Sequence, residues 1–215
     1  MQLSSSKWVS GLLIVIILLG GCSRSEDRSA FEYTAMGDKL LAEHQVEAAL
    51  AYYDKALVVK HDEELARKVI ALKYIQEITT YRYQLEGLDF YTLEFQNDET
   101  GNTYVREQLG KAVQLRDSLQ KIDDKYTRDD EAMNELHAEM LRTTDQYIDV
   151  RESLLNFREN ERTATEADNE QIVQDIRSTS ASMFRVREKY NALLVKYGYE
   201  EIPFDKLVNG EDGKS

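Results

Sequence analysis

The stretch IVQDIRSTSASMFRVREKYNALLVKYG, residues Ile172–Gly198, decides the fold class of this chain. Steps that alternate between four and three residues connect a row of mostly apolar side chains: Ile172, Ile176, Thr179, Met183, Val186, Tyr190, Leu193 and Tyr197. The mean step of about 3.5 residues is the period of a helix that packs along one seam against other helices. Gly198 follows this row, and glycine commonly ends helices. The stretch therefore predicts a long helix that ends at Gly198.

Earlier segments have the same period and predict further long helices. Glu63–Phe95 is expected to form one helix, in which Gly87 marks a bend. Gln96–Asn102 consists of residues that favour turns and is expected to be a loop. Thr103–Tyr126 resumes the helical period, and Thr127–Glu131 interrupts it with an acid-rich start for the next helix.

The helix that follows this interruption carries two adjacent apolar rows with a seven-residue repeat: Met133, Met140, Tyr147 and Leu154, and Leu141, Ile148 and Leu155. A stripe of that width predicts a helix that packs against more than one neighbour. Glu159–Asn169 is polar and is expected to contain the next turn, with Thr165 or Asp168 as the cap of the final helix.

Composition agrees with an all-α fold. Pro203 is the only proline, so no proline interrupts helix formation from Ser23 to Ile202. We predict an N-terminal helical hairpin, then an elongated, coiled-coil-like antiparallel bundle of long helices at 63–198, then a C-terminal tail at 199–215. The chain has 40 acidic and 27 basic residues, a net charge of −13. This charge argues against nucleic-acid binding, because a phosphate backbone requires an excess of Lys and Arg.

The N-terminus reads as an export signal. Lys7 precedes the apolar run Leu12–Leu19, and small residues follow it. This run is much shorter than the roughly 20 residues that a transmembrane helix needs. We therefore predict that residues 1–21 are a signal peptide that is cleaved.

The end of this segment, Leu19-Gly20-Gly21-Cys22, resembles the lipobox of bacterial lipoproteins. The resemblance implies that a diacylglycerol with acyl chains such as palmitate is attached to the sulfur of Cys22, and that the chain is cleaved just before it. The protein would then be lipid-anchored on the extracytoplasmic face of the cell membrane, or in the outer membrane of a diderm cell. Cys22 is the only cysteine, so lipidation leaves no thiol for other chemistry. Residues 22–29 are expected to be a tether.

Residues 30–62 carry the most specific internal pattern. Small and aromatic or aliphatic residues recur at the spacing of two antiparallel helices: Tyr33, Gly37, Leu40, Ala49, Tyr53 and Ala56. This hairpin resembles a single tetratricopeptide repeat, with Gly37 and Ala49 as close-contact positions and Tyr53 as the knob between them. His61 stands where the repeat usually has proline, and His61-Asp62 reads as a helix stop followed by a new N-cap. The pattern leaves open whether the hairpin binds a ligand or only packs in the bundle.

No pattern for catalysis, a cofactor or a metal is present. His44 and His61 lie at expected helix ends, and His137 has no second ligand at helical spacing, so exposed or capping roles are predicted for all three. The chain has no phosphate-binding loop, no nucleophile elbow and no zinc-protease motif. We predict a protein that is not an enzyme, with no catalytic residue, no cofactor and no small-molecule substrate.

Two hypotheses about the function follow from these predictions. Tyr52, Tyr83 and Tyr91 lie off the apolar rows and are the candidate partner surface. The main hypothesis is a membrane-anchored, extracytoplasmic helical interaction or scaffold module that binds another envelope protein through its hairpin. The alternative is a wall-associated structural spacer that binds peptidoglycan or another wall polymer. It rests on a similarity in length, in helicity and in the stretch Tyr190–Gly198 to cell-wall-binding lipoproteins of Gram-positive bacteria.

Overall fold

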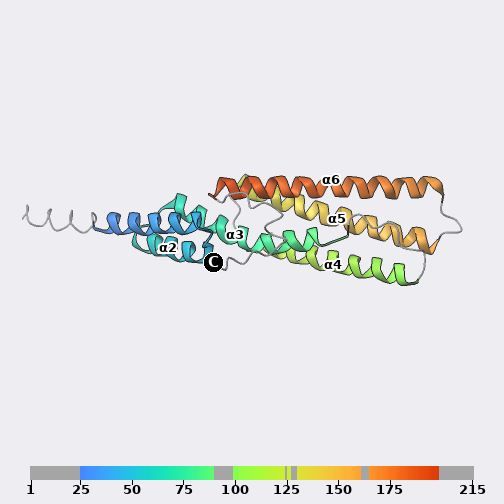
Figure 1. Cartoon of the computed structure of the whole chain (residues 1–215), viewed down its shortest axis with the longest axis horizontal. Coiled ribbons are helices and arrows are strands. Elements are labelled where there is room, and N and C mark those ends of the chain that lie inside the picture. Colours follow the sequence, from blue (N-terminus) through green and yellow to red (C-terminus); the bar gives the residue numbers. More distant parts are fainter. Residues whose placement is uncertain (1–24, 90–98, 124, 127–129, 161–164, 199–215) are drawn as a thin grey trace, which may run out of the picture. The chain divides into compact units, whose positions relative to one another are not determined.

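The computed structural model describes residues 25–89, 99–123, 125–126, 130–160 and 165–198. Within these ranges the chain forms helices and turns and no strand, so the fold is all-α, as predicted. The helices in chain order are residues 25–42, α2 (Val46–Val59), α3 (Glu63–Glu86), α4 (Glu99–Asp123), α5 (Glu131–Glu159) and α6 (Glu166–Lys196) (Figure 1). They belong to two compact units, described separately below. The N-terminal unit contains the described residues up to Leu72 together with Gly198, and the C-terminal unit those from Lys73 to Tyr197.

The N-terminal unit consists of helix 25–42, α2 and the first part of α3. Two helices thus occupy the range 30–62, where the sequence predicts a hairpin. Asp62 accepts a hydrogen bond from the backbone N–H of Leu65 at 3.0 Å and caps α3, which confirms the predicted new N-cap after His61. All three helices contribute buried side chains to the core: Ala30, Leu41, Ala49, Leu50, Tyr53, Ala56, Leu65, Val69, Ala71 and Leu72.

The predicted helix Glu63–Phe95 is too long. α3 ends at Glu86, and Gly87 and Leu88 follow in a turn in which the N–H of Leu88 donates to the carbonyl of Leu85 at 3.2 Å. The backbone carbonyl of Asp89 accepts hydrogen bonds from the hydroxyl of Tyr147 at 3.1 Å and from Arg151. These contacts with α5 hold the chain in the turn, and residues 90–95 lie outside the described residues.

The predicted loop Gln96–Asn102 is also wrong in its second half. α4 begins at Glu99, and the hydroxyl of Thr103 donates to the carbonyl of Glu99 at 2.8 Å. Glu99 in the first turn suits the positive end of the helix dipole. The residue types at positions 99–102 favour loops, but these positions form the first turn of the long helix α4.

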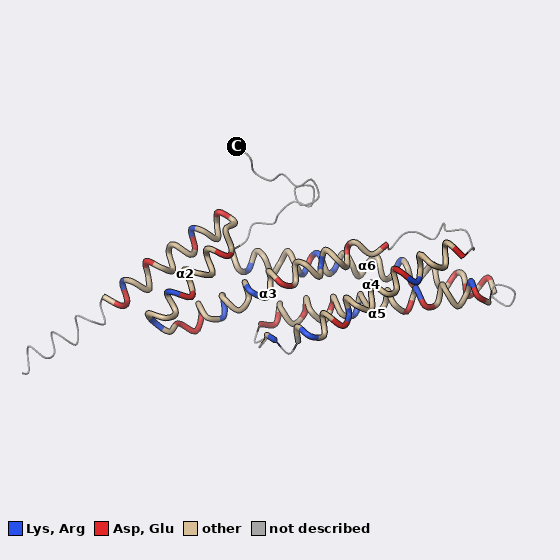
Figure 2. The backbone as a smooth tube through the Cα atoms, turned by 90° about the horizontal axis from the view of Figure 1, so that it is seen from below, with Lys and Arg blue, Asp and Glu red and all other residues tan. Residues whose placement is uncertain are grey.

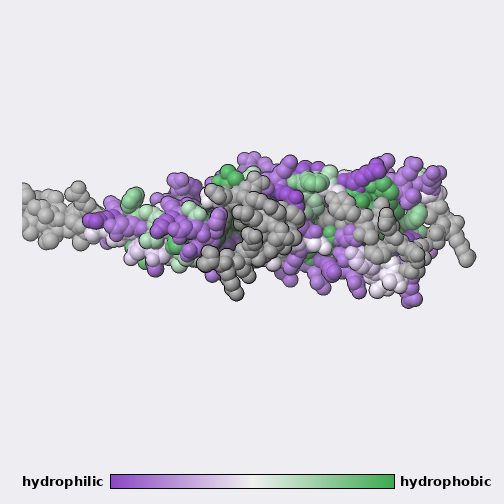
Figure 3. Space-filling view, in the orientation of Figure 1, coloured by the Kyte–Doolittle hydropathy of each residue, from purple (hydrophilic) through white to green (hydrophobic). Residues whose placement is uncertain are grey.

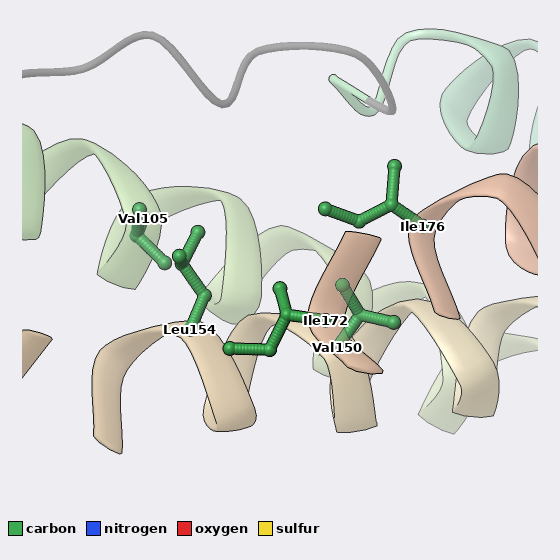
Figure 4. Packing of buried hydrophobic residues seen from close by; sticks show 5 residues of the cluster. All are labelled: Val105, Val150, Leu154, Ile172 and Ile176. Atoms are coloured by element: carbon green, nitrogen blue, oxygen red, sulfur yellow. The ribbon is translucent and has the colours of Figure 1, made fainter. Parts of the chain in front are cut away.

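The C-terminal unit is built around α5, which packs against both α4 and α6. α6 has 31 residues, a length of about 46 Å at 1.5 Å per residue. The two predicted rows of α5 face these neighbours: Met133, Met140, Tyr147, Leu154 and Ile148 are buried, and Leu141 and Leu155 are half-buried. Figure 4 shows the packing of one apolar cluster from α4, α5 and α6, which consists of Val105, Val150, Leu154, Ile172 and Ile176.

The helix ends of this unit confirm the predicted caps. Asp130 precedes α5, and its carboxylate accepts hydrogen bonds from the N–H groups of Ala132 and Met133. Thr165 and Asp168 form a reciprocal capping box at the start of α6, with N–H to oxygen distances of 3.2 and 2.8 Å. Gly198 follows α6 with a φ of 84°, which glycine adopts without strain.

Charged side chains are buried inside the C-terminal unit. Arg82 is 3% exposed, donates to Glu86 at 2.6 Å, and has its guanidinium 4.4 Å from the ring centre of Tyr83 and 4.6 Å from that of Tyr190. Glu86 also pairs with Arg187 at 3.3 Å. Stacking on aromatic rings stabilises a desolvated guanidinium, so the cluster joins α3 to α6 through both charge and ring contacts.

A second buried charge lies between α5 and α6. Glu139 accepts hydrogen bonds from Arg142 and from Arg185, the latter at 2.9 Å. Burial alone would raise the pKa of Glu139, but the hydrogen bonds from the two arginines outweigh burial and hold the pKa below its ordinary value.

The described surface in the view of Figure 3 is mostly hydrophilic. Acidic and basic residues are interspersed along the helices (Figure 2), and hydrophobic residues form only small, separate areas in the view of Figure 3. Within the part of the chain that the structure describes, no helix is both long enough and apolar enough to cross a bilayer.

Candidate functional site

Helix 25–42 and α2 approach closely at the contact that the repeat-like pattern predicts. Gly37 is buried, and a Cβ atom at this position would lie 2.5 Å from Cε1 of Tyr53. Tyr53 is fully buried between the helices, as are Ala49 and Ala56. The small residues therefore let helix 25–42 and α2 approach closely around one aromatic ring.

Two other predicted packing residues are less buried. Tyr33 and Leu40 are half-buried. The ring of Tyr33 lies 6.3 Å from that of Tyr52, with the planes tilted by 49°. The hairpin core therefore depends on Gly37, Ala49, Tyr53 and Ala56, and the two larger residues on helix 25–42 cover its edge.

A groove of about 450 Å³ lies beside this contact, within the N-terminal unit. Helix 25–42 and the start of α3 form its two walls, and the end of α2 closes it: Asp27, Ala30, Phe31, Thr34, Asp38, Ala56, Lys60, Asp62, Glu64, Leu65 and Lys68. Ala30, Ala56 and Leu65 are buried and form an apolar floor, whereas Phe31 is 73% exposed. The groove thus offers apolar contact area between two charged rims.

Asp38 organises one rim. Its carboxylate accepts hydrogen bonds from the hydroxyl of Tyr53 and from the amine of Lys68, both at 2.7 Å. The amine also lies 4.8 Å from the centre of the Tyr53 ring. Partial burial would raise the pKa of Asp38, but the hydrogen bonds from Lys68 and Tyr53 lower it below the ordinary value. Asp38 is therefore ionised at neutral pH and fixes the positions of both partners.

The other charges of the groove do not balance. Lys60 pairs with Asp27 at 2.8 Å, as Lys68 does with Asp38 at 2.7 Å. Asp62 and Glu64 line the same groove and form no ion pair within 4 Å in the described ranges, although Asp62 lies close enough to Lys60 to contribute, after the hydrogen bond to Asp27, to the raised pKa of its amine. The groove therefore presents a net negative charge over an apolar floor.

The three tyrosines of the predicted partner surface belong to different parts of the chain. Tyr52 is half-buried against Tyr33 and has the amine of Lys55 4.5 Å from its ring centre. Tyr83 is 39% exposed and belongs to the C-terminal unit. Tyr91 lies outside the described residues.

The predictions about the anchor fall mostly outside the described residues. The signal peptide at 1–21, Cys22 and the tail at 199–215 are among the residues that the structure does not describe. The expected tether 22–29 needs correction, because residues 25–29 already belong to the first helix. Their charges do not block helix formation, so polarity alone was a poor sign of a linker.

The described side chains contain no cluster of three or more His, Cys, Asp or Glu residues that could hold a metal. His44 and His61 are exposed at helix ends, as predicted. The prediction for His137 is wrong: this residue is 1% exposed, and its ring lies 6.4 Å from that of Tyr74. Comparison of the chain with protein families, with curated proteins and with solved structures finds no match.

Sequence reasoning missed Phe31 and Val58, which are 73% and 87% exposed. Both lie outside the repeat-like row. A large apolar residue that does not belong to a packing row is a candidate for an exposed position, and this sign could have identified both.

Proposed function

We propose that this protein is a lipid-anchored, extracytoplasmic helical interaction module of a bacterial cell envelope, and that it binds another envelope protein through the groove of its N-terminal unit. The lipobox-like sequence at Cys22 supports the location. The groove is the observation that carries the interaction, because it combines an apolar floor with charged rims in a unit whose own core is already filled. Enzymatic activity is not part of the proposal.

The groove chemistry indicates the kind of partner. Asp62 and Glu64 add two negative charges to a groove whose lysines are already paired. Charge complementarity selects partners and speeds their encounter. The occupant is therefore a short segment of an envelope protein that carries Lys or Arg beside an apolar side chain, which would contact the accessible edges of Leu65 and Ala30.

Site-specific photo-crosslinking in intact cells tests this proposal. A photoreactive phenylalanine analogue replaces Thr34, which lines the groove, and the control places it at the exposed neighbour Ala35. The expected result is a crosslink from position 34 to a basic and apolar segment of one envelope protein, with little product from position 35. Mass spectrometry of the crosslinked peptide identifies the segment.

A charge change provides the second arm. Glu64→Gln should weaken the crosslink, whereas Glu63→Gln should leave it unchanged, because Glu63 is exposed but does not line the groove. Equal crosslinking from positions 34 and 35, or equal effects of the two Gln variants, would contradict the groove. Recovery of wall glycan in place of a protein would favour the spacer alternative.

A further inference from the structure

We propose that the end of the N-terminal unit that carries Phe31 and Val58 rests on the lipid surface beside the anchor, with the Phe31 ring in the interfacial layer. The proposal deepens the proposed function and rests on lipidation of Cys22. It commits to a lipid bilayer as the occupant of this exposed apolar end.

The covalent reach of the chain brings this end to the membrane. Helix 25–42 starts three residues after Cys22, so the Cα atoms of Cys22 and Ser25 are at most about 11 Å apart at 3.8 Å per peptide. Acyl chains on Cys22 would hold that residue at the bilayer surface. Phe31 follows Ser25 by six residues, or about 9 Å along the helix. Aromatic side chains on helices point back toward the helix N-terminus, here toward the anchor.

The end of α2 lies at the same end of the unit. Lys60 pairs with Asp27 at 2.8 Å, which places the residues that close α2 next to the first turns of helix 25–42. Val58 lies two residues before Lys60 and is 87% exposed. Phe31 and Val58 are the two most exposed large hydrophobic side chains in the described part of the chain. Scattered exposed apolar residues are normal, but these two lie beside the predicted attachment point.

The ion pairs around Phe31 predict that its contact with the bilayer is apolar rather than electrostatic. Within the described residues, Arg28 pairs with Glu32 at 3.0 Å and Lys60 with Asp27 at 2.8 Å, so these two cations are already paired. Strong attraction to anionic headgroups is therefore not expected, and binding of the end should depend on insertion of Phe31 and be insensitive to salt. The Thr34 and Glu64 part of the groove remains available to the partner proposed above.

Tryptophan fluorescence tests the contact directly. Trp8 is the only tryptophan and belongs to the segment expected to be removed, so Phe31→Trp creates a single reporter in the mature chain. The full-length gene is expressed, and the protein is purified from membranes and reconstituted into phosphatidylcholine vesicles with brominated acyl chains. The matched control is Ala42→Trp, an exposed position on the same helix. It lies on nearly the same face, 11 residues further on, or about 16 Å along the axis.

The expected result is bromine quenching at least about twofold stronger for Phe31→Trp than for Ala42→Trp, because interfacial side chains sit about 5–10 Å into the boundary layer. Val58→Trp should be quenched as well, and 0.5 M salt should not change the result. Circular dichroism confirms that each variant is folded.

The outcomes separate the two proposals. Intact-mass measurement that shows no lipid on Cys22 overturns the anchor and, with it, this inference. A lipidated protein in which Phe31→Trp is quenched no more than Ala42→Trp overturns the lipid contact and leaves the proposed function standing. If the emission spectrum of the Phe31→Trp variant depends on protein concentration in vesicles without bromine, the end belongs to a contact with a second copy of the chain, which also overturns the lipid contact.

Discussion

Gly37→Ala should destabilise the N-terminal unit, although alanine is the better helix former. The added Cβ would lie 2.5 and 2.6 Å from Cε1 and Cδ1 of Tyr53. Nonbonded carbon atoms normally pack about 3.5–4.0 Å apart, so the ring must shift by roughly 1 Å. Tyr53 is fully buried and donates to Asp38 at 2.7 Å. The ring therefore has no open space into which it can move without disturbing that bond.

The opposing free energies can be compared. Alanine favours a helix by about 1 kcal/mol relative to glycine. Overpacking a core costs about 1–3 kcal/mol, and loss of a hydrogen bond to a charged group costs about 1.5–3 kcal/mol. Even if the Tyr53–Asp38 bond is only partly lost, a net loss of about 1–3 kcal/mol follows.

Gly110→Ala is the matched control. Gly110 is exposed inside α4, and a Cβ there would meet nothing within 4 Å. This variant should gain about 0.5–1 kcal/mol. Urea unfolding followed by circular dichroism measures the free energy of unfolding of each variant, and amide hydrogen exchange in α2 reports on the N-terminal unit alone. If Gly37→Ala stabilises the protein as Gly110→Ala does, the close contact with Tyr53 is refuted. Partial recovery in Gly37→Ala with Tyr53→Leu would assign the loss to the ring.

The remaining predictions concern the C-terminal unit. Arg82→Met should cost about 1–3 kcal/mol in urea unfolding, because it leaves Glu86 with only its longer pair to Arg187, whereas the double variant with Glu86→Leu should cost less than the single change. The pKa of Glu139 is lowered in the folded state, so its stabilising effect is present above the ordinary value of 4.5 and is lost as pH falls through the folded pKa. Glu139→Gln should therefore flatten the fall in melting temperature below about pH 5; an unchanged slope would refute the assigned role. Thr165→Ala should cost about 1 kcal/mol by removing the α6 cap, and Thr165→Ser should restore it in the same unfolding assay.

The sequence predicted the features that depend on local spacing. The period from Ile172 to Tyr197 predicted α6, and the sequence offered Thr165 or Asp168 as its cap, two residues that both take part in the capping box. Gly37 and Tyr53 were predicted to meet because a small residue and an aromatic one stood at the spacing of a helical hairpin. These inferences needed no knowledge of distant contacts.

The features that the sequence did not predict depend on distant partners. α3 ends at Glu86, and Asp89 just after the turn accepts hydrogen bonds from Tyr147 and Arg151, which lie 58 and 62 residues away along the chain. The apolar period continues past that point, so spacing alone predicted more helix. His137 is buried against Tyr74, which belongs to another helix, and its own helix offered no sign of this contact.

Arg82 and Phe31 show why charge and hydrophobicity were misleading at single positions. Arg82 is 3% exposed, with one guanidinium nitrogen bonded to Glu86 and the group stacked on two tyrosine rings, while its Nε and Nη2 atoms have no hydrogen-bond partner among the described residues. Phe31 is 73% exposed, and Tyr53 already fills the hairpin core. A buried ion pair costs desolvation free energy that apolar residues of the same volume would avoid, so the Arg82 cluster is better explained as fixing how α3 and α6 align than as a source of stability. The Phe31 ring, which does not pack in the hairpin core, has a different explanation. Its position beside the predicted lipid attachment point makes contact with the bilayer the role that best fits its exposure.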